Sequence, residues 1–377
     1  KNLILIDNGQ GLLLVNTSYS TITECAVYNN TYGFSLYSSS NNIIEKCTLY
    51  NNSDDSIHLD YSSNNTITKC TVYNNTYGIR LRYSSNNNIT NSSAYNNSDD
   101  GIYLSSSSNN KVVNCTVYNS FDGIHLSSSS NNTVTNCTIY DSFPYQNYSG
   151  IWLDSSSDNT ITLNQIYNNY YGIYLYSSSD NTMLSNQIYN NYYGIYLSSS
   201  SNNNQITNCT IYNNNGYGIY LYCSSNTLMT ANKIYNNYYG ICLDFTSNSM
   251  IHYNNIYNNT NYGVYNYYYT YQYVANATYN WWGDASGPYH PETNPGGNGD
   301  KVSYNVIYGP WLTEPWEGVS QPPTADFTYS PIPPTAQDII QFTDKSSDVD
   351  GHIVSWYWDF GDGNNSTSQH PTHSYAY

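Results

Sequence analysis

Two aspartates one repeat apart have the clearest potential for acid–base chemistry. Asp100 and Asp122 each stand directly before a Gly-Ile pair, 22 residues apart. If successive repeats form successive turns of a solenoid, their carboxyl groups lie roughly 5 Å apart, the strand spacing of a sheet. An acid beside a carboxylate is the pair that a glycoside hydrolase needs. Asp before Gly is also an ordinary turn residue, and this structural interpretation is the favoured one.

Other outward positions carry a base, an acid and two cations. His58, Asp60, Arg80 and Arg82 fall on two consecutive repeats. A histidine beside arginines is a combination that a polysaccharide lyase could use, with the imidazole as base and the guanidinium as cation. These residues form a second, lyase-like candidate cluster.

An aromatic strip occupies the equivalent position in later repeats. Its members are Trp152, Tyr174, Tyr196 and Tyr220. Exposed aromatic side chains mark surfaces that bind sugars or proteins. The alternative is that Tyr is simply a good strand residue. Binding by this strip is therefore a hypothesis that stays open.

The element that must position all these side chains is a short repeat. Gly-Ile-x-Leu recurs along the chain at spacings of 22 to 24 residues, apart from one spacing of 27 that carries extra residues around 142–148. Alternating apolar residues indicate strands with one buried face. Gly, Asn, Ser and Asp between them indicate turns. The repeat predicts an all-β protein, a parallel β-helix of about 11 rungs whose stacked turns bury continuous apolar columns.

Equivalent residues should then form ladders. One column holds Tyr in eleven successive repeats, from Tyr28 to Tyr257. Another holds most of the cysteines, including Cys47, Cys70 and Cys209. Their Cβ vectors point the same way, so we expect buried free thiols and no disulfides.

The repeat units, with Asn-Asn-Thr-Ile-Thr and Tyr-Gly-Ile-Tyr-Leu segments, resemble the right-handed parallel β-helix repeats of the NosD-like group, which is abundant in archaeal, especially methanogen, cell-surface proteins. The segment Trp281-Trp282-Gly283 with Pro310-Trp311-Leu312 resembles the closing segment of such helices. We therefore assign residues 1–275 to the β-helix and 276–312 to a C-terminal cap, followed by a linker over 313–323.

The last part of the chain carries a different signature. Trp358-Asp359-Phe360-Gly361-Asp362-Gly363 is similar to the core of the PKD domain, an immunoglobulin-like β-sandwich, which we assign to residues 324–377. The resemblance implies a calcium loop at Asp348 and Asp350, as in some family members; no other cofactor is expected. The domain lacks its usual final strand, which predicts a fragment of a longer precursor or a subunit completed by its neighbours.

Composition restricts the partners. The net charge is −17 with only 9 Lys and Arg, which excludes a basic nucleic-acid-binding protein. No apolar run is long enough to span a membrane. Acidity and Asn-x-Ser/Thr sequons indicate an extracellular or cell-surface location. The candidate glycosylation sites are Asn29, Asn51, Asn74, Asn96, Asn131, Asn147 and Asn258.

These observations favour a non-enzymatic role. We expect an extracellular structural protein of surface-layer, sheath or fibre type, whose partners are copies of itself or other cell-surface proteins and, as an option, polysaccharide. The alternative is a polysaccharide-active enzyme, either lyase or glycoside hydrolase, or a carbohydrate-binding module on the same β-helix. Whether the chain is an enzyme stays open at this point.

Overall fold

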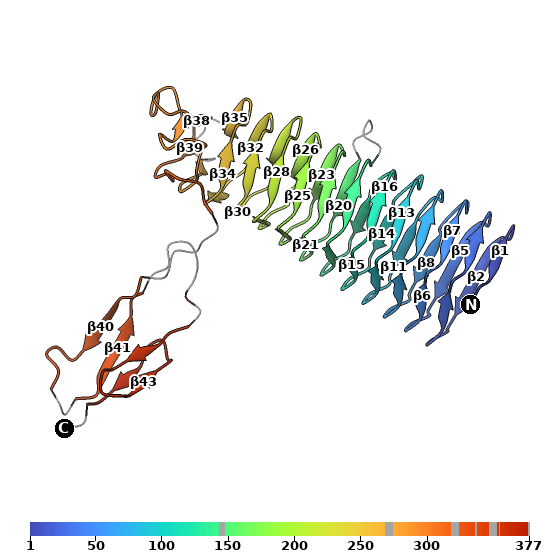
Figure 1. Cartoon of the computed structure of the whole chain (residues 1–377), viewed down its shortest axis with the longest axis horizontal. Coiled ribbons are helices and arrows are strands. Elements are labelled where there is room, and N and C mark those ends of the chain that lie inside the picture. The colour runs from blue at the N-terminus through green and yellow to red at the C-terminus, as the bar shows by residue number, and fades with distance from the viewer. Residues whose placement is uncertain are drawn as a thin grey trace. The chain divides into compact units, whose positions relative to one another are not determined.

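The computed structural model describes residues 1–142, 148–267, 274–317, 324–335, 338–346, 353 and 355–375. The chain divides into two units, Lys1–Trp316 and Glu317–Tyr377. The first unit is a parallel β-helix in which three strands alternate along each turn and three long sheets run along its axis (Figure 1). The described residues contain strands and no helix.

The strands of each sheet follow one another every third strand in the chain. Sheet A contains β1 (Ile4–Ile6), β4 (Ala26–Tyr28), β7 (Thr48–Tyr50), β10 (Thr71–Tyr73), β13 (Ser93–Tyr95), β16 (Thr116–Tyr118), β19 (Thr138–Tyr140), β22 (Gln165–Tyr167), β25 (Gln187–Tyr189), β28 (Thr210–Tyr212), β31 (Lys233–Tyr235) and β34 (Asn255–Tyr257). Sheet B contains β2 (Gln10–Val15), β5 (Tyr32–Tyr37), β8 (Ile57–Asp60), β11 (Ile79–Arg82), β14 (Ile102–Ser105), β17 (Ile124–Ser127), β20 (Ser149–Asp154), β23 (Tyr171–Tyr176), β26 (Tyr193–Ser198), β29 (Tyr217–Tyr222), β32 (Tyr239–Asp244) and β35 (Tyr262–Asn266). Sheet C contains β3 (Thr21–Thr23), β6 (Ile43–Glu45), β9 (Thr66–Thr68), β12 (Asn88–Thr90), β15 (Lys111–Val113), β18 (Thr133–Thr135), β21 (Thr160–Thr162), β24 (Thr182–Leu184), β27 (Gln205–Thr207), β30 (Leu228–Thr230), β33 (Met250–His252), β36 (Ala275–Asn276) and β39 (Val306–Ile307).

Residues one repeat apart lie directly over one another. Tyr118 pairs with Tyr140 in parallel register, and their rings stack with centroids 4.9 Å apart. The in-register coil predicted from the repeat is therefore confirmed. Sheets A and B each contain 12 strands, so the solenoid has one turn more than the eleven or so expected.

Two kinds of buried column hold the turns together. The interior is filled by Ile, Leu and Val side chains that are almost completely buried, such as Ile173 and Leu175. Buried asparagines at the turns form ladders in which each side-chain amide donates to the next, as from Asn110 to Asn132. Such ladders satisfy the turn amides and favour register between identical turns.

The glycine before the Ile-x-Leu segment is needed because the turns approach closely there. A Cβ on Gly172 would lie 2.5 Å from the carbonyl oxygen of Gly194. Only glycine fits without moving the backbone of the next turn. This contact explains why Gly recurs at this point of nearly every repeat.

The cysteines behave as expected from their column. All eight are free, and seven of them are buried, with Cys223 half-buried. The thiols of Cys115 and Cys137 lie under carbonyl oxygens of the preceding turn, at Ile89 and Val112. They pack as small apolar side chains with weak S–H donors.

The last turn is covered by the segment that follows it. Asn280 continues an asparagine ladder by accepting from Asn254, and Asp300 accepts from the backbone and side chain of Asn259. Trp282 is fully buried against the interior. This segment also contributes the short pair β37 (Pro288–Tyr289) and β38 (Gly299–Lys301). The asparagine ladders that end at Asn254 and Asn259 thereby find acceptors in this segment.

The second unit contains short antiparallel strands. One sheet is β40 (Phe327–Ser330), β41 (Ile340–Asp344) and β44 (Thr372–His373), and a second pair is β42 (Trp358–Asp359) and β43 (Asn365–Ser366). Aromatic rings of Phe327, Phe342, Trp358 and Phe360 pack between them. Residues 318–323 of the expected linker lie outside the described residues.

Candidate functional site

The outward face of sheet B carries the side chains that sequence analysis singled out. In each strand, alternate residues point into the core and out of it. One outward column lies between the buried Ile and Leu, and a second lies just before the glycine. The first reads Leu13, Ser35, His58, Arg80, Tyr103, His125, Trp152, Tyr174, Tyr196, Tyr220, Cys242 and Tyr265. The second includes Asp55, Tyr77, Asp100, Asp122, Ser149 and Tyr171.

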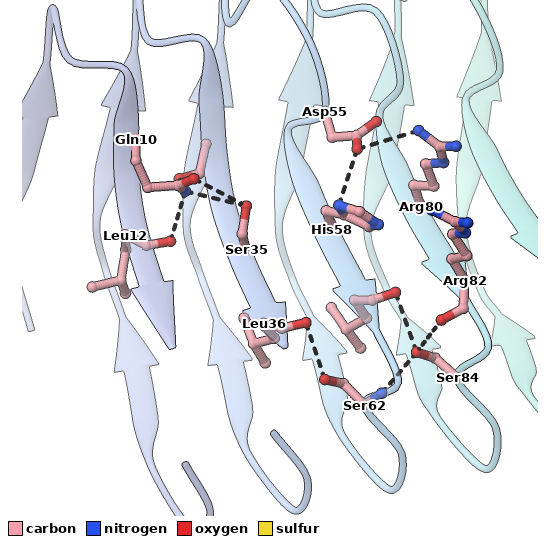
Figure 2. A network of polar contacts seen from close by, with 12 residues as sticks. Gln10, Leu12, Ser35, Leu36, Asp55, His58, Ser62, Arg80, Arg82 and Ser84 are labelled. Carbon is pink, nitrogen blue, oxygen red and sulfur yellow. Dashed lines mark hydrogen bonds and ion pairs between the residues drawn. The ribbon is translucent and has the colours of Figure 1, made fainter. Parts of the chain in front are cut away.

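Asp55, His58 and Arg80 meet on two consecutive turns and are named here the arginine cluster (Figure 2). Asp55 precedes β8, His58 lies in β8, and Arg80 lies in β11. The Oδ2 atom of Asp55 is 3.2 Å from His58 Nδ1 and 3.5 Å from Arg80 Nη1. Asp55 is 1% exposed and His58 7% exposed, so both are nearly out of contact with solvent.

Burial sets the protonation of this cluster. It raises the pKa of Asp55 to about 6, although the Arg80 guanidinium opposes the shift. Burial, with Arg80 adding to it, lowers the pKa of His58 to about 4. Both shifts follow from the cost of a charge in a low-dielectric site. At neutral pH the cluster therefore contains a carboxylate, a neutral imidazole and one fixed cation.

Arg80 remains partly accessible and lies beside two tyrosine rings that stack on each other, with ring centres 5.6 Å apart. Its guanidinium carbon is 4.7 Å from the ring centre of Tyr77 and 5.7 Å from that of Tyr103. The side chain of Arg80 is 26% exposed. Arg82 lies farther along the same strand, over the ring of Tyr83. Stacked guanidinium groups keep their donors in a fixed plane, which suits carboxylate recognition.

Asp100, Asp122 and His125 form a second group, the carboxylate cluster. Asp100 precedes β14, and Asp122 and His125 belong to the next turn, at β17. The Nδ1 atom of His125 is 3.0 Å from Asp100 Oδ2, and Asp122 accepts a hydrogen bond from the backbone amide of Ser149. The expected proximity of Asp100 and Asp122 is found: one ligand-type atom from each of the three side chains lies within 4.8 Å of the others.

The carboxylate cluster is more deeply buried than a sugar-binding site. Asp100 is 3% exposed, Asp122 2% and His125 9%. Burial, together with the neighbouring Asp100, raises the pKa of Asp122 to about 7, and burial also raises the pKa of Asp100. A proton shared between the two turns is compatible with these shifts. In this conformation the two carboxyl groups are closed to direct contact with a glycosidic bond.

The aromatic strip begins directly after the carboxylate cluster. Trp152 stacks on His125 at 4.1 Å, Tyr174 stacks on Tyr196 at 5.1 Å, and Tyr196 stacks on Tyr220 at 5.2 Å. A parallel row adds Tyr171, Tyr193, Tyr217 and Tyr239. Because the ring faces cover one another, the strip presents ring edges and hydroxyls to solvent. A ligand of this surface would meet hydrogen-bonding groups and ring edges instead of open ring faces.

The remaining predicted site residues do not gather at one place. Asp60 is buried at the end of β8, in direct register with Arg82 of the next turn. The candidate glycosylation sites Asn29, Asn51, Asn74, Asn96, Asn131 and Asn258 are exposed at turns, so a glycan has room at each. Asn147, Asp348 and Asp350 lie outside the described residues.

Sequence reasoning missed two features of this face. His125 was placed in the outward column but not joined to Asp100, which lies 25 residues earlier. Tyr77 and Tyr103 were not recognised as the rings against which Arg80 packs. The Asp-x-x-His spacing shared by Asp55–His58 and Asp122–His125 places an acid near each imidazole but does not indicate the bond from His125 to Asp100.

Comparison with known families agrees with this architecture. The family described as "Right handed beta helix region" matches residues 10–145, 114–238 and 193–312, and the PKD domain matches residues 320–377. A curated relative, collagenase ColQ1 of Bacillus cereus (strain Q1), is 43% identical over 77 residues, which are 20% of this chain. The match spans only 8% of the collagenase.

Solved structures share the fold at low sequence identity. The A-module of mannuronan C-5 epimerase AlgE6 from Azotobacter vinelandii is 16% identical, with a TM-score of 0.51 and 81% of each chain covered. The Dettilon tailspike protein is 13% identical, with a TM-score of 0.54, covering 91% of this chain and 69% of the tailspike. At these identities the likeness concerns the fold alone.

Among the described residues, no helix is long and apolar enough to cross a membrane.

Proposed function

The chain belongs to the right-handed β-helix family and carries a PKD domain after the helix, and from this premise we propose that it is an exported scaffold protein whose sheet B face binds an acidic polysaccharide. The observation that carries the proposal is the placement of its arginines. The chain has only two, Arg80 and Arg82, and both lie on this face, each over a tyrosine ring.

Charge explains why this placement favours an anionic ligand. A chain of net charge −17 repels acidic polymers over most of its surface. Arg80 and Arg82 are the exceptions on sheet B, and the guanidinium of Arg80 packs against the stacked rings of Tyr77 and Tyr103. A guanidinium that is fixed in this way binds a carboxylate with little loss of conformational freedom.

The repeat of the solenoid fits an extended polymer. Hydroxyl-bearing rings recur at successive turns from β23 to β29, with spacings of 5.1 to 5.2 Å between the rings of Tyr174, Tyr196 and Tyr220. An extended polysaccharide lying along the axis would present a new sugar at roughly each turn, so that one weak contact is repeated many times. A structurally similar protein is a mannuronan epimerase, which supports a polysaccharide-directed use of this fold.

Binding to soluble polymers tests the proposal. The protein should be retarded in gels that contain polygalacturonate or alginate but not in gels that contain dextran. Arg80→Lys with Arg82→Gln should weaken binding about tenfold, because bidentate contacts are lost. Lys46→Gln with Lys69→Gln removes two exposed cations from the turn between sheets C and A and should leave binding unchanged.

Two results would overturn it: equal retardation by dextran, or an equal loss of binding in the lysine control. The same samples should be assayed for new reducing ends and unsaturated products. Polymer cleavage that is abolished by Asp100→Asn with Asp122→Asn would assign an enzyme instead of a binding scaffold.

A purely structural role in a cell-surface assembly is the second candidate. It is favoured by the uninterrupted tyrosine ladder of sheet A, in which Tyr28 to Tyr257 repeat at every turn. Electron microscopy of the native material should then reveal filaments or lattices. Single dispersed particles at high concentration would contradict self-assembly.

A further inference from the structure

The two clusters on sheet B differ in their charge balance. In the arginine cluster, the single carboxylate of Asp55 has Arg80 as its cation. In the carboxylate cluster, two carboxyl groups face only the imidazole of His125, and no Lys or Arg forms an ion pair with them among the described residues. A buried pair of like charges needs a compensating positive charge or a proton.

Some buried polar atoms of the carboxylate cluster also lack hydrogen-bond partners among the described residues. Asp100 Oδ1 and His125 Nε2 are buried and have no hydrogen-bond partner in the described part of the chain. Asp100 and His125 are 3% and 9% exposed. Buried polar atoms without partners are uncommon and indicate that a further group belongs at the site.

We propose that Asp100, Asp122 and His125 bind one divalent transition-metal ion, for which Zn²⁺ is the probe of choice. Two carboxylates and one imidazole are a ligand set that suits Zn²⁺ and its neighbours better than Ca²⁺, which prefers six or more oxygens. An ion reaches a site that is closed to a sugar, so this role fits the burial of the three side chains. The inference does not depend on polysaccharide binding.

Neighbouring aromatic rings hold the imidazole of His125 in position. The imidazole of His125 lies between Tyr103, with ring centres 4.8 Å apart, and Trp152, 4.1 Å away. Ligand atoms that share a tetrahedral zinc ion at ~2.1 Å stand ~3.4 Å apart, so side chains that start within 4.8 Å of one another need to close by up to about 1.4 Å. Bound metal would join two consecutive turns of the solenoid at this point.

Metal content and calorimetry test the proposal on the whole chain. After removal of metal with a chelator, the wild type should take up one Zn²⁺ per chain. Asp122→Asn and His125→Gln should each weaken Zn²⁺ binding at least tenfold. Asp55→Asn removes the equivalent aspartate of the arginine cluster and should leave Zn²⁺ binding unchanged.

Free cysteines are the competing ligands, and cobalt distinguishes them. Co²⁺ bound by carboxylates and imidazole lacks the strong near-ultraviolet absorption of thiolate ligation. Asp122→Asn should fold, because the amide keeps the shape and removes one of two buried charges, and its melting temperature should no longer rise with Zn²⁺. Absence of stoichiometric zinc in the wild type, thiolate absorption with cobalt, tighter binding of Ca²⁺ than Zn²⁺, or unchanged binding in Asp122→Asn would each overturn the proposal.

Discussion

The outward face of sheet B has two halves that share one backbone and differ in chemistry. From β8 to β17 the outward columns carry Asp, His and Arg, whereas from β23 to β29 they carry Tyr in both columns. The buried Ile-x-Leu core and its parallel register are the same in both halves. The strands have four residues from β8 to β17 and six from β23 to β29, where the tyrosine before the glycine is part of the strand. The shared core therefore does not dictate the outward side chains, and departures from tyrosine need their own explanation.

The cost of burying charge indicates that the outward side chains of the first half, from β8 to β17, serve a function. Stacked tyrosines bury apolar area without burying charge. The charged half instead buries the carboxyl groups of Asp55, Asp60, Asp100 and Asp122. Burial raises the pKa of Asp55, Asp100 and Asp122. Desolvated charges lower stability unless a partner compensates them. A chain selected only for rigidity would have had tyrosine available at these positions too.

Truncation of the shared core should have the largest effect and should be equal in the two halves. Leu126 and Leu197 are both fully buried at equivalent positions. Leu126→Ala and Leu197→Ala should each lower the free energy of unfolding by about 2–5 kcal/mol. Urea denaturation measures both. A much smaller effect at Leu126 would indicate that the charged half is packed differently and that the two halves do not share one core.

Removal of Arg80 should have the next largest effect on stability, and this effect should depend on pH. Arg80→Gln leaves the buried Asp55 without its cation, which should lower stability by about 2 kcal/mol at pH 7, since the pair is partly exposed. Asp55→Asn in the same protein should restore most of this loss. Failure of that rescue would contradict the assigned ion pair.

The pH dependence follows from the direction of the shifts. Burial raises the pKa of Asp55 from its ordinary value near 4 to about 6, so the folded state holds more protons and stability falls as pH rises between these values. Without Arg80 the pKa of Asp55 rises further and the fall deepens. Besides burial, Arg80 contributes to lowering the pKa of His58 to about 4. Removal of Arg80 therefore makes His58 easier to protonate in the folded state, which stabilises the variant relative to the wild type at low pH. The difference between wild type and Arg80→Gln should therefore shrink at pH 4 and grow towards pH 7.

Removal of a single ring from the tyrosine half should lower stability less, and this loss should be independent of pH. Tyr196 stacks on Tyr174 and Tyr220. Tyr196→Thr keeps a strand-forming residue and should lower stability by about 1 kcal/mol through loss of the stacks. The loss should be the same at pH 5 and pH 7, measured by thermal unfolding. A clear pH dependence would show that the tyrosine half also contains a coupled charge.

Much of this architecture follows from periodicity, and the limits of periodicity are equally visible. Columns such as Tyr118 over Tyr140 could be predicted because every turn has the same path. The proximity of Asp100 and Asp122 followed for the same reason. The bond from His125 to Asp100 could not be predicted, because it depends on which way two side chains lean between turns.

Burial was the other quantity that the sequence could not supply. Aspartate before glycine at a turn suggested solvent contact, yet Asp100 and Asp122 are covered by neighbouring side chains of the same face. The aromatic strip suggested open ring faces, yet the turn spacing brings the rings into mutual contact. In both cases the side chains of adjacent turns determine exposure, and a single repeat does not contain that information.

The smallest expected effect distinguishes a tyrosine column of sheet B from the tyrosine ladder of sheet A. Tyr193→Phe keeps the ring stacks of sheet B and removes one hydroxyl, so stability should change by less than about 0.5 kcal/mol. If the hydroxyl edges bind polysaccharide, the affinity for polygalacturonate should still fall about threefold, as expected for one hydrogen bond. Tyr50→Phe is the matched control in the sheet A ladder, where Tyr50 stacks between Tyr28 and Tyr73. Its affinity should be unchanged. Equal losses in the two variants would mean that the tyrosine ladders are equivalent surfaces, and only the arginines would then distinguish sheet B as the binding face.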